Sequence, residues 1–464
     1  MIPPGRPEGE GQRVAPHGAS PPDSTDSNVG PTHGPLPWLT QARRISQVVE
    51  HPRFSGGNEA ELLRGGDALF PAMAQAIAQA RHEVWLATYI YTDEGSVRQV
   101  TEALAAAARR GVQVKVVVDG FGSRVDLPGL REALCGAGVL LTVFRPMDRW
   151  WNWLQPGQLR RLHQKLCVVD GEVAFVGGIN LLDDRLDHVH GWTDQPRLDF
   201  AVRLRGPVVA PVEQAVRALW TRARLGRNVR EELSALARSA RPMARTRRLL
   251  GRLRMPAGGP PAADGEAESL PPVRAAFVLR DNLRRRRAIE RTYIDAIRKA
   301  RDRVDLVSPY FYPGRAFRRV LRQAARRGVR VRLLLQGKVD YRIAALAAQA
   351  LYDELLGHGV RIFEYVPAFL HAKVALVDED WATVGSSNID PLSLLLNLEA
   401  NIVLRDPGFA AALAVQFDAA IAVSREIDLT QQSHPRGWRG LLRRGWVAWC
   451  ANVYLRIAGA TGRY

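Results

Sequence analysis

The sequence has little cysteine. Its 464 residues include only Cys135, Cys167 and Cys450, and no CxxC pair. So few unpaired thiols predict neither a disulfide framework nor a structural zinc site, and are typical of a reduced, intracellular protein. Walker-type loops, HExxH and GxSxG are also absent from the sequence. The ordinary motifs of P-loop, zinc-protease and α/β-hydrolase chemistry are therefore excluded.

Long hydrophobic runs are missing as well. The apolar run at 445–460 is interrupted by Asn452 and Arg456, and it is shorter than the ~20 residues that a membrane-spanning helix needs. The N-terminus has no basic start followed by an apolar core, so it is not a secretory signal. Residues 1–36 are rich in Pro, Gly and Ser, and we expect them to be a disordered tail.

Positive charge, in contrast, is abundant. The formal net charge is +18 and the isoelectric point is about 10.6. Such an excess predicts a polyanionic partner, either a nucleic acid or an anionic lipid surface, and does not choose between them.

The chain repeats one pattern of helices and strands. Residues 76–91, AIAQARHEVWLATYIY, match residues 296–311, AIRKARDRVDLVSPYF, and residues 108–120, ARRGVQVKVVVDG, match residues 325–337, ARRGVRVRLLLQG. Apolar residues at helical spacing precede short apolar strands in both copies, which predicts a βαβ rhythm. We expect a duplicated α/β protein with two hydrophobic cores.

A second repeated pattern carries candidate chemistry. The segments LHQKLCVVDGEVAFVGGIN (162–180) and LHAKVALVDEDWATVGSSN (370–388) share the spacing HxK-x4-D-x6-G-(G/S)-x-N. Imidazole, ammonium and carboxamide groups suit an anionic group of phosphate size. Two complete copies are very hard to obtain by chance, so we expect each half to present such a cluster. The residues concerned are His163, Lys165, Asp170, Gly178 and Asn180 in the first copy and His371, Lys373, Asp378, Ser386 and Asn388 in the second.

Each copy is expected to form a β-hairpin. A turn centred between Asp170 and Gly171 places His163 opposite Gly178, and the same arithmetic places His371 opposite Ser386. The period of two puts the lysine and asparagine of each copy on the face of its histidine. Asp170 and Asp378 fall at the turns, where a structural role and a direct role in the site both stay open.

Both segments resemble the HKD motif of the phospholipase D superfamily, and the resemblance covers about residues 55–425. GNEAELLRGGDALFPAM, YIYTDEG, GGIN and DFAVRLRGP are similar to bacterial cardiolipin synthases, especially the type B branch. The resemblance implies two similar α/β/α sandwich domains, at 37–237 and 273–428, with the active site at their interface. A basic Pro/Gly-rich linker is expected at 238–272.

The resemblance also implies a phosphatidyltransferase that needs no cofactor. One histidine attacks phosphorus to form a phosphohistidine, and the other protonates the departing alcohol. His163 is assigned as the nucleophile and His371 as the acid–base, and the reverse order stays open. The family pattern further implies an acidic partner for each imidazole, which Asp199 and Glu399 match.

The insert at 181–196, LLDDRLDHVHGWTDQP, gathers aspartates and histidines. Their spacing matches no familiar ligand set, so we expect a polar rim loop and no metal.

Two further segments favour a membrane surface over nucleic acid. Residues 149–161 place three tryptophans among arginines, and residues 429–464 are basic and then apolar, as expected for a segment lying in the interface. We expect a peripheral protein at the cytoplasmic face of the cell membrane. Its expected partners are anionic phospholipids, with phosphatidylglycerol first and phosphatidylethanolamine as a further candidate. Hydrolysis by a phospholipase D or nuclease, and a non-catalytic lipid-binding scaffold, are the alternatives.

Overall fold

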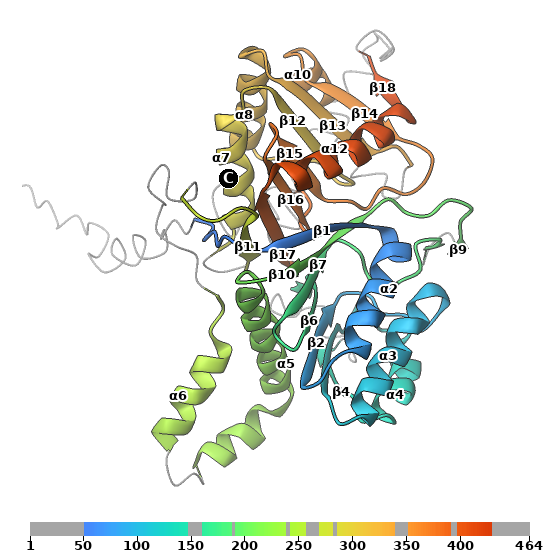
Figure 1. Ribbon diagram of the computed structural model, residues 1–464, viewed down its shortest axis with the longest axis vertical. Coiled ribbons are helices and arrows are strands. Elements are labelled where there is room, and N and C mark those ends of the chain that lie inside the picture. The colour runs from blue at the N-terminus through green and yellow to red at the C-terminus, as the bar shows by residue number, and fades with distance from the viewer. Residues whose placement is uncertain are drawn as a thin grey trace, which may run out of the picture. The chain divides into compact units, whose positions relative to one another are not determined.

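The computed structural model describes residues 51–146, 160–187, 191–237, 242–256, 269–281, 285–338, 351–390 and 397–428 (Figure 1). All of them belong to one unit of the chain, residues 49–464. The tail predicted at 1–36, the tryptophan-rich segment apart from its last two residues, and the C-terminal segment from residue 429 lie outside the described residues.

The first half is built on a seven-stranded sheet with the strand order β1-β10-β7-β6-β2-β3-β4. The parallel pairs β2–β3 and β3–β4 follow the predicted βαβ rhythm, and the other neighbours are antiparallel. Its elements are β1 (Glu59–Arg64), α2 (Gly65–Ala78), β2 (Glu83–Thr88), η1 (Gly95–Val97), α3 (Arg98–Arg109), β3 (Gln113–Asp119), α4 (Leu127–Cys135), β4 (Leu140–Phe144), β5 (Arg161–Leu162), β6 (Lys165–Val169), β7 (Val173–Gly177), β8 (Leu186–Asp187), β9 (Gly191–Trp192), β10 (Phe200–Arg205), α5 (Val209–Ala237) and α6 (Pro242–Leu253).

The second half repeats this plan in the order β11-β17-β16-β15-β12-β13-β14-β18. Its elements are β11 (Arg274–Arg280), α7 (Ala288–Lys299), β12 (Arg303–Ser308), α8 (Arg315–Arg326), β13 (Arg330–Gln336), α10 (Tyr352–Leu356), β14 (Arg361–Tyr365), β15 (Val374–Val377), β16 (Trp381–Gly385), β17 (Asn397–Arg405), α12 (Pro407–Ala422) and β18 (Ser424–Ile427). The duplicated α/β architecture predicted from the repeats is confirmed.

Three hydrophobic clusters hold the layers together. One lies between the first sheet and the outer helices α2, α3 and α4, and an equivalent cluster lies between the second sheet and α7 and α8. The third is shared, because it joins residues of β6, β7, β10 and α5 to residues of β15, β16, β17 and α12. The two halves therefore bury apolar surface against each other, which fixes the site between them.

The predicted hairpin register is wrong by one residue. The structure pairs Lys165 with Gly177 and Val169 with Val173, so the loop has three residues and not two. Asp170 and Gly171 both adopt the left-handed conformation, with φ of 51° and 70°. In the second copy Val374 pairs with Val384, again one residue away from the expected register.

Each motif histidine lies before its hairpin strand, and the segment that carries it joins the other half of the chain. β5 of the first half pairs in parallel with β17 of the second, with Leu162 next to Leu398. A parallel bridge between Leu198 and Leu370 is its counterpart. These two crossings bring the segments that carry the histidines to one seam.

The predicted linker at 238–272 contains a helix that the sequence analysis did not predict. α6 packs against α5, and both are visible in Figure 1. Arginine and small residues obscure its pattern in the sequence. Among the helices of the described residues, none has the length and apolarity needed to cross a bilayer.

Candidate active site

The imidazole rings of His163 and His371 come together, as the family resemblance implied. Their centroids are 6.5 Å apart and the ring planes make an angle of 60°. The backbone explains the approach: His163 N–H donates to the Leu398 carbonyl at 3.0 Å, and His371 N–H donates to the Leu198 carbonyl at 2.9 Å. Each histidine is thus anchored to the opposite half of the chain.

Each imidazole is paired with a buried carboxylate, and the pairs cross between the halves. His163 Nδ1 lies 3.0 Å from Glu399 Oε2, and His371 Nδ1 lies 2.6 Å from Asp199 Oδ2. The sequence analysis named both acids but did not predict that each would serve the histidine of the other half. Since Nδ1 is occupied in both rings, Nε2 is the nitrogen left for chemistry.

The residue before each histidine is held by a side chain at an equivalent position, buried in the first half and partly buried in the second. Asp119 Oδ2 accepts the Leu162 N–H at 2.8 Å, and Gln336 Oε1 accepts the Leu370 N–H at the same distance. Asp119 and Gln336 end β3 and β13, at the matching positions of VVVDG and LLLQG. The sequence analysis missed both, although the aligned repeats contained the signal.

The motif lysines are buried beside the histidines. Lys165 Nζ donates to the His163 carbonyl at 2.8 Å, and Lys373 donates to the His371 carbonyl. Burial lowers the pKa of Lys165 to about 7 and that of Lys373 to about 8, although nearby carboxylates oppose the shift. An anion entering the site would stabilise the charged form of both lysines.

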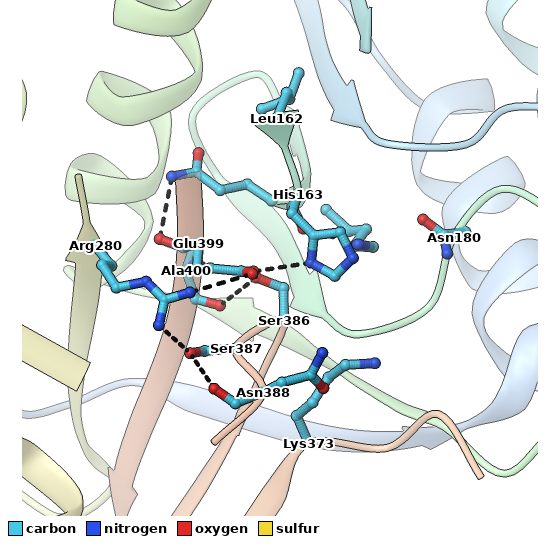
Figure 2. Close-up of polar contacts among 12 residues, drawn as sticks. Leu162, His163, Asn180, Arg280, Lys373, Ser386, Ser387, Asn388, Glu399 and Ala400 are labelled. Atoms are coloured by element: carbon cyan, nitrogen blue, oxygen red, sulfur yellow. Dashed lines mark hydrogen bonds and ion pairs between the residues drawn. The ribbon is translucent and has the colours of Figure 1, made fainter. Parts of the chain in front are cut away.

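Asn180, Asn388, Gly178 and Ser386 have unequal surroundings. Figure 2 shows Asn180, Asn388 and Lys373 around His163, and the buried Oδ1 of Asn388 has no hydrogen-bond partner among the described residues. Ser386 donates to Glu399 Oε2 and accepts from the Ala400 N–H, so it orients the acid. At Gly178 a Cβ atom would lie 2.4 Å from Asp199 Oδ1, so the missing side chain makes room for that acid.

The two motif aspartates do not join the histidines. Asp170 accepts the backbone N–H groups of Arg81, His82 and Glu83, and Asp378 accepts those of residues 301–303. Each lies at the far end of a strand of four or five residues, on the order of 15 Å from the lysine of its motif. A direct catalytic role, one of the two possibilities kept from the sequence, does not fit this geometry, and the structural role does.

Replacing Asp170 by alanine should therefore cost stability and not catalysis. The change removes three backbone hydrogen bonds and puts alanine at a positive φ, so we expect a loss of about 1–3 kcal/mol. Although burial opposes it, the N–H groups lower the pKa of Asp170 below 3.8, so its contribution is present above that pH and is lost as the pH falls through the lowered value. Urea unfolding at two pH values and kcat measure the two effects. A fall in kcat at unchanged stability would contradict this role.

Two aspartates of the insert at 181–196 accept hydrogen bonds from the first turns of helices. Asp183 accepts from the Ser96 N–H and hydroxyl near η1, and Asp184 accepts from the Gly66 N–H in the first turn of α2. Within the residues that the structure describes, no group of three or more His, Cys, Asp or Glu side chains could hold a metal ion. His188 and His190 of the insert lie outside those residues.

Arg280 is a site residue that the sequence analysis missed. Its side chain is 1% exposed, with Nη2 3.3 Å from Glu399 Oε1 and Nη1 donating to Ser387 Oγ at 2.9 Å. Figure 2 shows Arg280, Glu399 and His163 in one connected row. An arginine in one short strand gives no signal of this kind, because its partner lies more than a hundred residues away.

Comparisons with known proteins agree with this arrangement. A family model described as "Cardiolipin synthase, PLD-like domain" matches residues 73–190 and again residues 293–421. Among solved structures, phosphatidylserine synthase of Haemophilus influenzae Rd KW20 has a TM-score of 0.61 at 12% identity, covering 90% of this chain and 100% of that chain, which shows likeness of fold alone. The fold and the paired motifs define a duplicated protein of the phospholipase D-like class.

Sequence relatives are more specific. Cardiolipin synthase B of Escherichia coli K12 is 36% identical over 393 residues, which cover 82% of this chain and 85% of that protein. Cardiolipin synthase A of Pseudomonas fluorescens SBW25 is 32% identical over 379 residues, covering 82% and 72%. The chain belongs to the cardiolipin synthase family, as the segments GNEAELLRGGDALFPAM, YIYTDEG, GGIN and DFAVRLRGP predicted.

Proposed function

We propose that the protein is a phosphatidyltransferase that makes cardiolipin. It transfers a phosphatidyl group from one phosphatidylglycerol to the glycerol hydroxyl of another and releases glycerol. The supporting observation is the 6.5 Å separation of two imidazoles whose Nδ1 atoms are both held by carboxylates. One phosphate between the rings can meet one Nε2 at an attack distance of about 3–3.5 Å and offer its leaving oxygen to the other.

In the first step, Nε2 of one histidine forms a bond to phosphorus as the bond from phosphorus to the glycerol oxygen breaks. The second histidine gives its Nε2 proton to that oxygen. In the second step it takes a proton from the acceptor hydroxyl, whose oxygen bonds to phosphorus as the P–N bond breaks. One P–O bond replaces another, so the transfer needs no external energy source.

Positive groups hold the phosphate during both steps. Lys165 and Lys373 supply charge, and the carboxamides of Asn180 and Asn388 supply directed N–H donors. Nδ1 of each ring donates to its acid, which stabilises the positive charge that develops on the imidazole. In this mechanism the described residues supply the nucleophile, the acid and the groups that bind the anion.

We place the protein peripherally on the cytoplasmic face of the cell membrane. The net charge of +18 supports attraction to anionic headgroups, each basic residue near such a surface contributing on the order of 1 kcal/mol. Phosphatidylethanolamine is a further candidate donor, because the reacting phosphodiester is the same.

The test is a product analysis with labelled phosphatidylglycerol in vesicles. We expect labelled cardiolipin and free glycerol in equal amounts, and added labelled phosphatidylethanolamine shows whether a second donor is used. Phosphatidic acid as the main product would replace transfer by hydrolysis. Vesicle binding without any product would support the alternative of a non-catalytic lipid-binding scaffold.

A further inference from the structure

The residues that pair with Glu399 and with Asp199 on the neighbouring strands differ in charge between the two halves. In the second sheet, Arg280 pairs with Glu399. In the first sheet, Arg64 pairs with Phe200, so the next residue, Gly65, lies opposite Asp199 and donates its N–H to the Asp199 carbonyl at 2.9 Å. Gly65 therefore occupies the place that the buried Arg280 has in the other half.

On the Glu399 side this difference adds a permanent cation. Arg280 is fully buried, and a buried guanidinium is costly unless a charged partner stays ionised beside it. Burial alone would raise the pKa of Glu399, but its interaction with His163, together with Arg280 and Lys165, lowers that pKa below the ordinary value. Glu399 is held as a carboxylate.

On the Asp199 side the difference adds a second acid. The Oδ2 atom of Asp184 lies 2.7 Å from where a Cβ atom on Gly65 would be. Burial raises the pKa of Asp184 to about 6, against the Gly66 N–H and Arg197. Burial also raises the pKa of Asp199 to about 7, and Asp184 adds to that rise while Lys373 opposes it.

The proton count of each histidine–acid pair decides what Nε2 can do. With one proton in the pair, Nδ1–H donates to the carboxylate and Nε2 carries a lone pair. With two protons, Nε2 carries a hydrogen whether the other proton rests on Nδ1 or on the carboxylate. A pair with one proton can attack phosphorus, and a pair with two can protonate a leaving group.

Resting on the transfer mechanism above, we propose that Arg280 and Asp184 are positioning residues that decide which pair carries the second proton. Arg280 balances the charge of Glu399 and keeps that proton off His163, so His163 attacks. Asp184 adds negative charge beside Asp199 and holds the proton on the His371 pair, so His371 is the acid.

Other charged groups also face the pairs, and the two motif lysines face both of them. Lys165 and Lys373 oppose protonation of either imidazole, and burial lowers the pKa of His163 to about 4 and that of His371 well below its ordinary value. The second proton of the His371 pair is therefore shared with Asp199. Arg197 acts against it, but Arg197 also forms an ion pair with Asp187 at 3.6 Å. His163 also lowers the pKa of His371, and Asp390 raises the pKa of Lys373.

The test measures protonation at each histidine without substrate. Diethyl pyrocarbonate acylates an imidazole nitrogen that has a lone pair, and peptide mass spectrometry of the full-length protein separates His163 from His371. We expect the His163 rate to reach its plateau at lower pH than the His371 rate. Arg280→Gln should raise the His163 midpoint by about 1–3 pH units, the effect of removing one nearby charge, and Arg280→Lys should restore it.

Asp184→Asn is the independent variant, because it keeps an acceptor for the Gly66 N–H while removing the charge. It should lower the His371 midpoint by about one pH unit and leave the His163 midpoint in place. The proposal is overturned if the acylation rates of His163 and His371 have the same pH midpoint in the wild type, or if the midpoints do not move in variants that fold. A merely structural role would lower the melting temperature and change both rates at every pH. Because acylation needs no lipid, a failure of transfer in vesicles is a separate result.

Discussion

Replacing His163 by glutamine will reduce phosphatidyl transfer by a factor on the order of 10⁴ or more and remove the labelled phosphoenzyme. The change takes away the nitrogen that bonds to phosphorus and leaves His371, Asp199 and both lysines in place. His371→Gln will lower the rate by about 10²–10⁴-fold, the usual contribution of acid–base catalysis. Rapid base-quench experiments with lipid labelled in the phosphate measure both effects, because the P–N bond of a phosphohistidine is stable in base.

A phosphodiester with an acidic leaving alcohol separates the two roles. Such an alcohol leaves as its anion and needs no general acid. This substrate will therefore restore phosphoenzyme formation in His371→Gln and not in His163→Gln. The intermediate will accumulate in the first variant, because its base for the acceptor is missing. The exposed His82→Gln serves as the matched control, with unchanged rates. Restoration in the His163 variant alone would reverse the assignment.

Replacing Lys165 or Lys373 by methionine will lower kcat/KM by about 10²–10³-fold each, the cost of removing one preorganised charge from an anionic transition state. The wild type should also lose kcat/KM as the pH rises through about 7–8, because the pKa of Lys165 is about 7 and that of Lys373 about 8. Above these values the lysines of the empty site are neutral and attract the phosphodiester less. Initial rates in vesicles between pH 6 and 9 measure this fall in kcat/KM.

Lys299→Met, at the exposed end of α7, is the control for lost surface charge. The Lys299→Met variant should change vesicle binding slightly and leave the pH dependence of kcat/KM unaltered. Equal losses in all three lysine variants would mean that the motif lysines act only through the charge of the surface.

The sequence predicted the duplication, the meeting of His163 with His371, and the identity of the acids Asp199 and Glu399. The duplication follows from spacing that the chain repeats, whereas the meeting of the histidines and the choice of the acids followed from the resemblance to the phospholipase D superfamily. It did not predict the hairpin register, because Asp170 in the left-handed conformation lengthens the loop by one residue. Nor did it predict Arg280, whose role depends on tertiary contacts that no local pattern encodes.

Asp170 and Asp378, whose direct role was left open by the sequence, show the same limit. Their position in the motif is as regular as that of the histidines, yet their carboxylates accept N–H groups at the start of β2 and β12. Regular spacing shows that a residue matters to the repeated unit. Only the three-dimensional contacts show whether it matters to folding or to chemistry.

The crossed pairing of His163 with Glu399 and of His371 with Asp199 has a consequence for how this duplicated chain can evolve. Each half needs the other half for the carboxylate that orients its imidazole, so neither half can form an active site alone. The outer helices can change in sequence independently, whereas a substitution where the halves meet affects both histidine–acid pairs. The two repeated halves therefore have to evolve together.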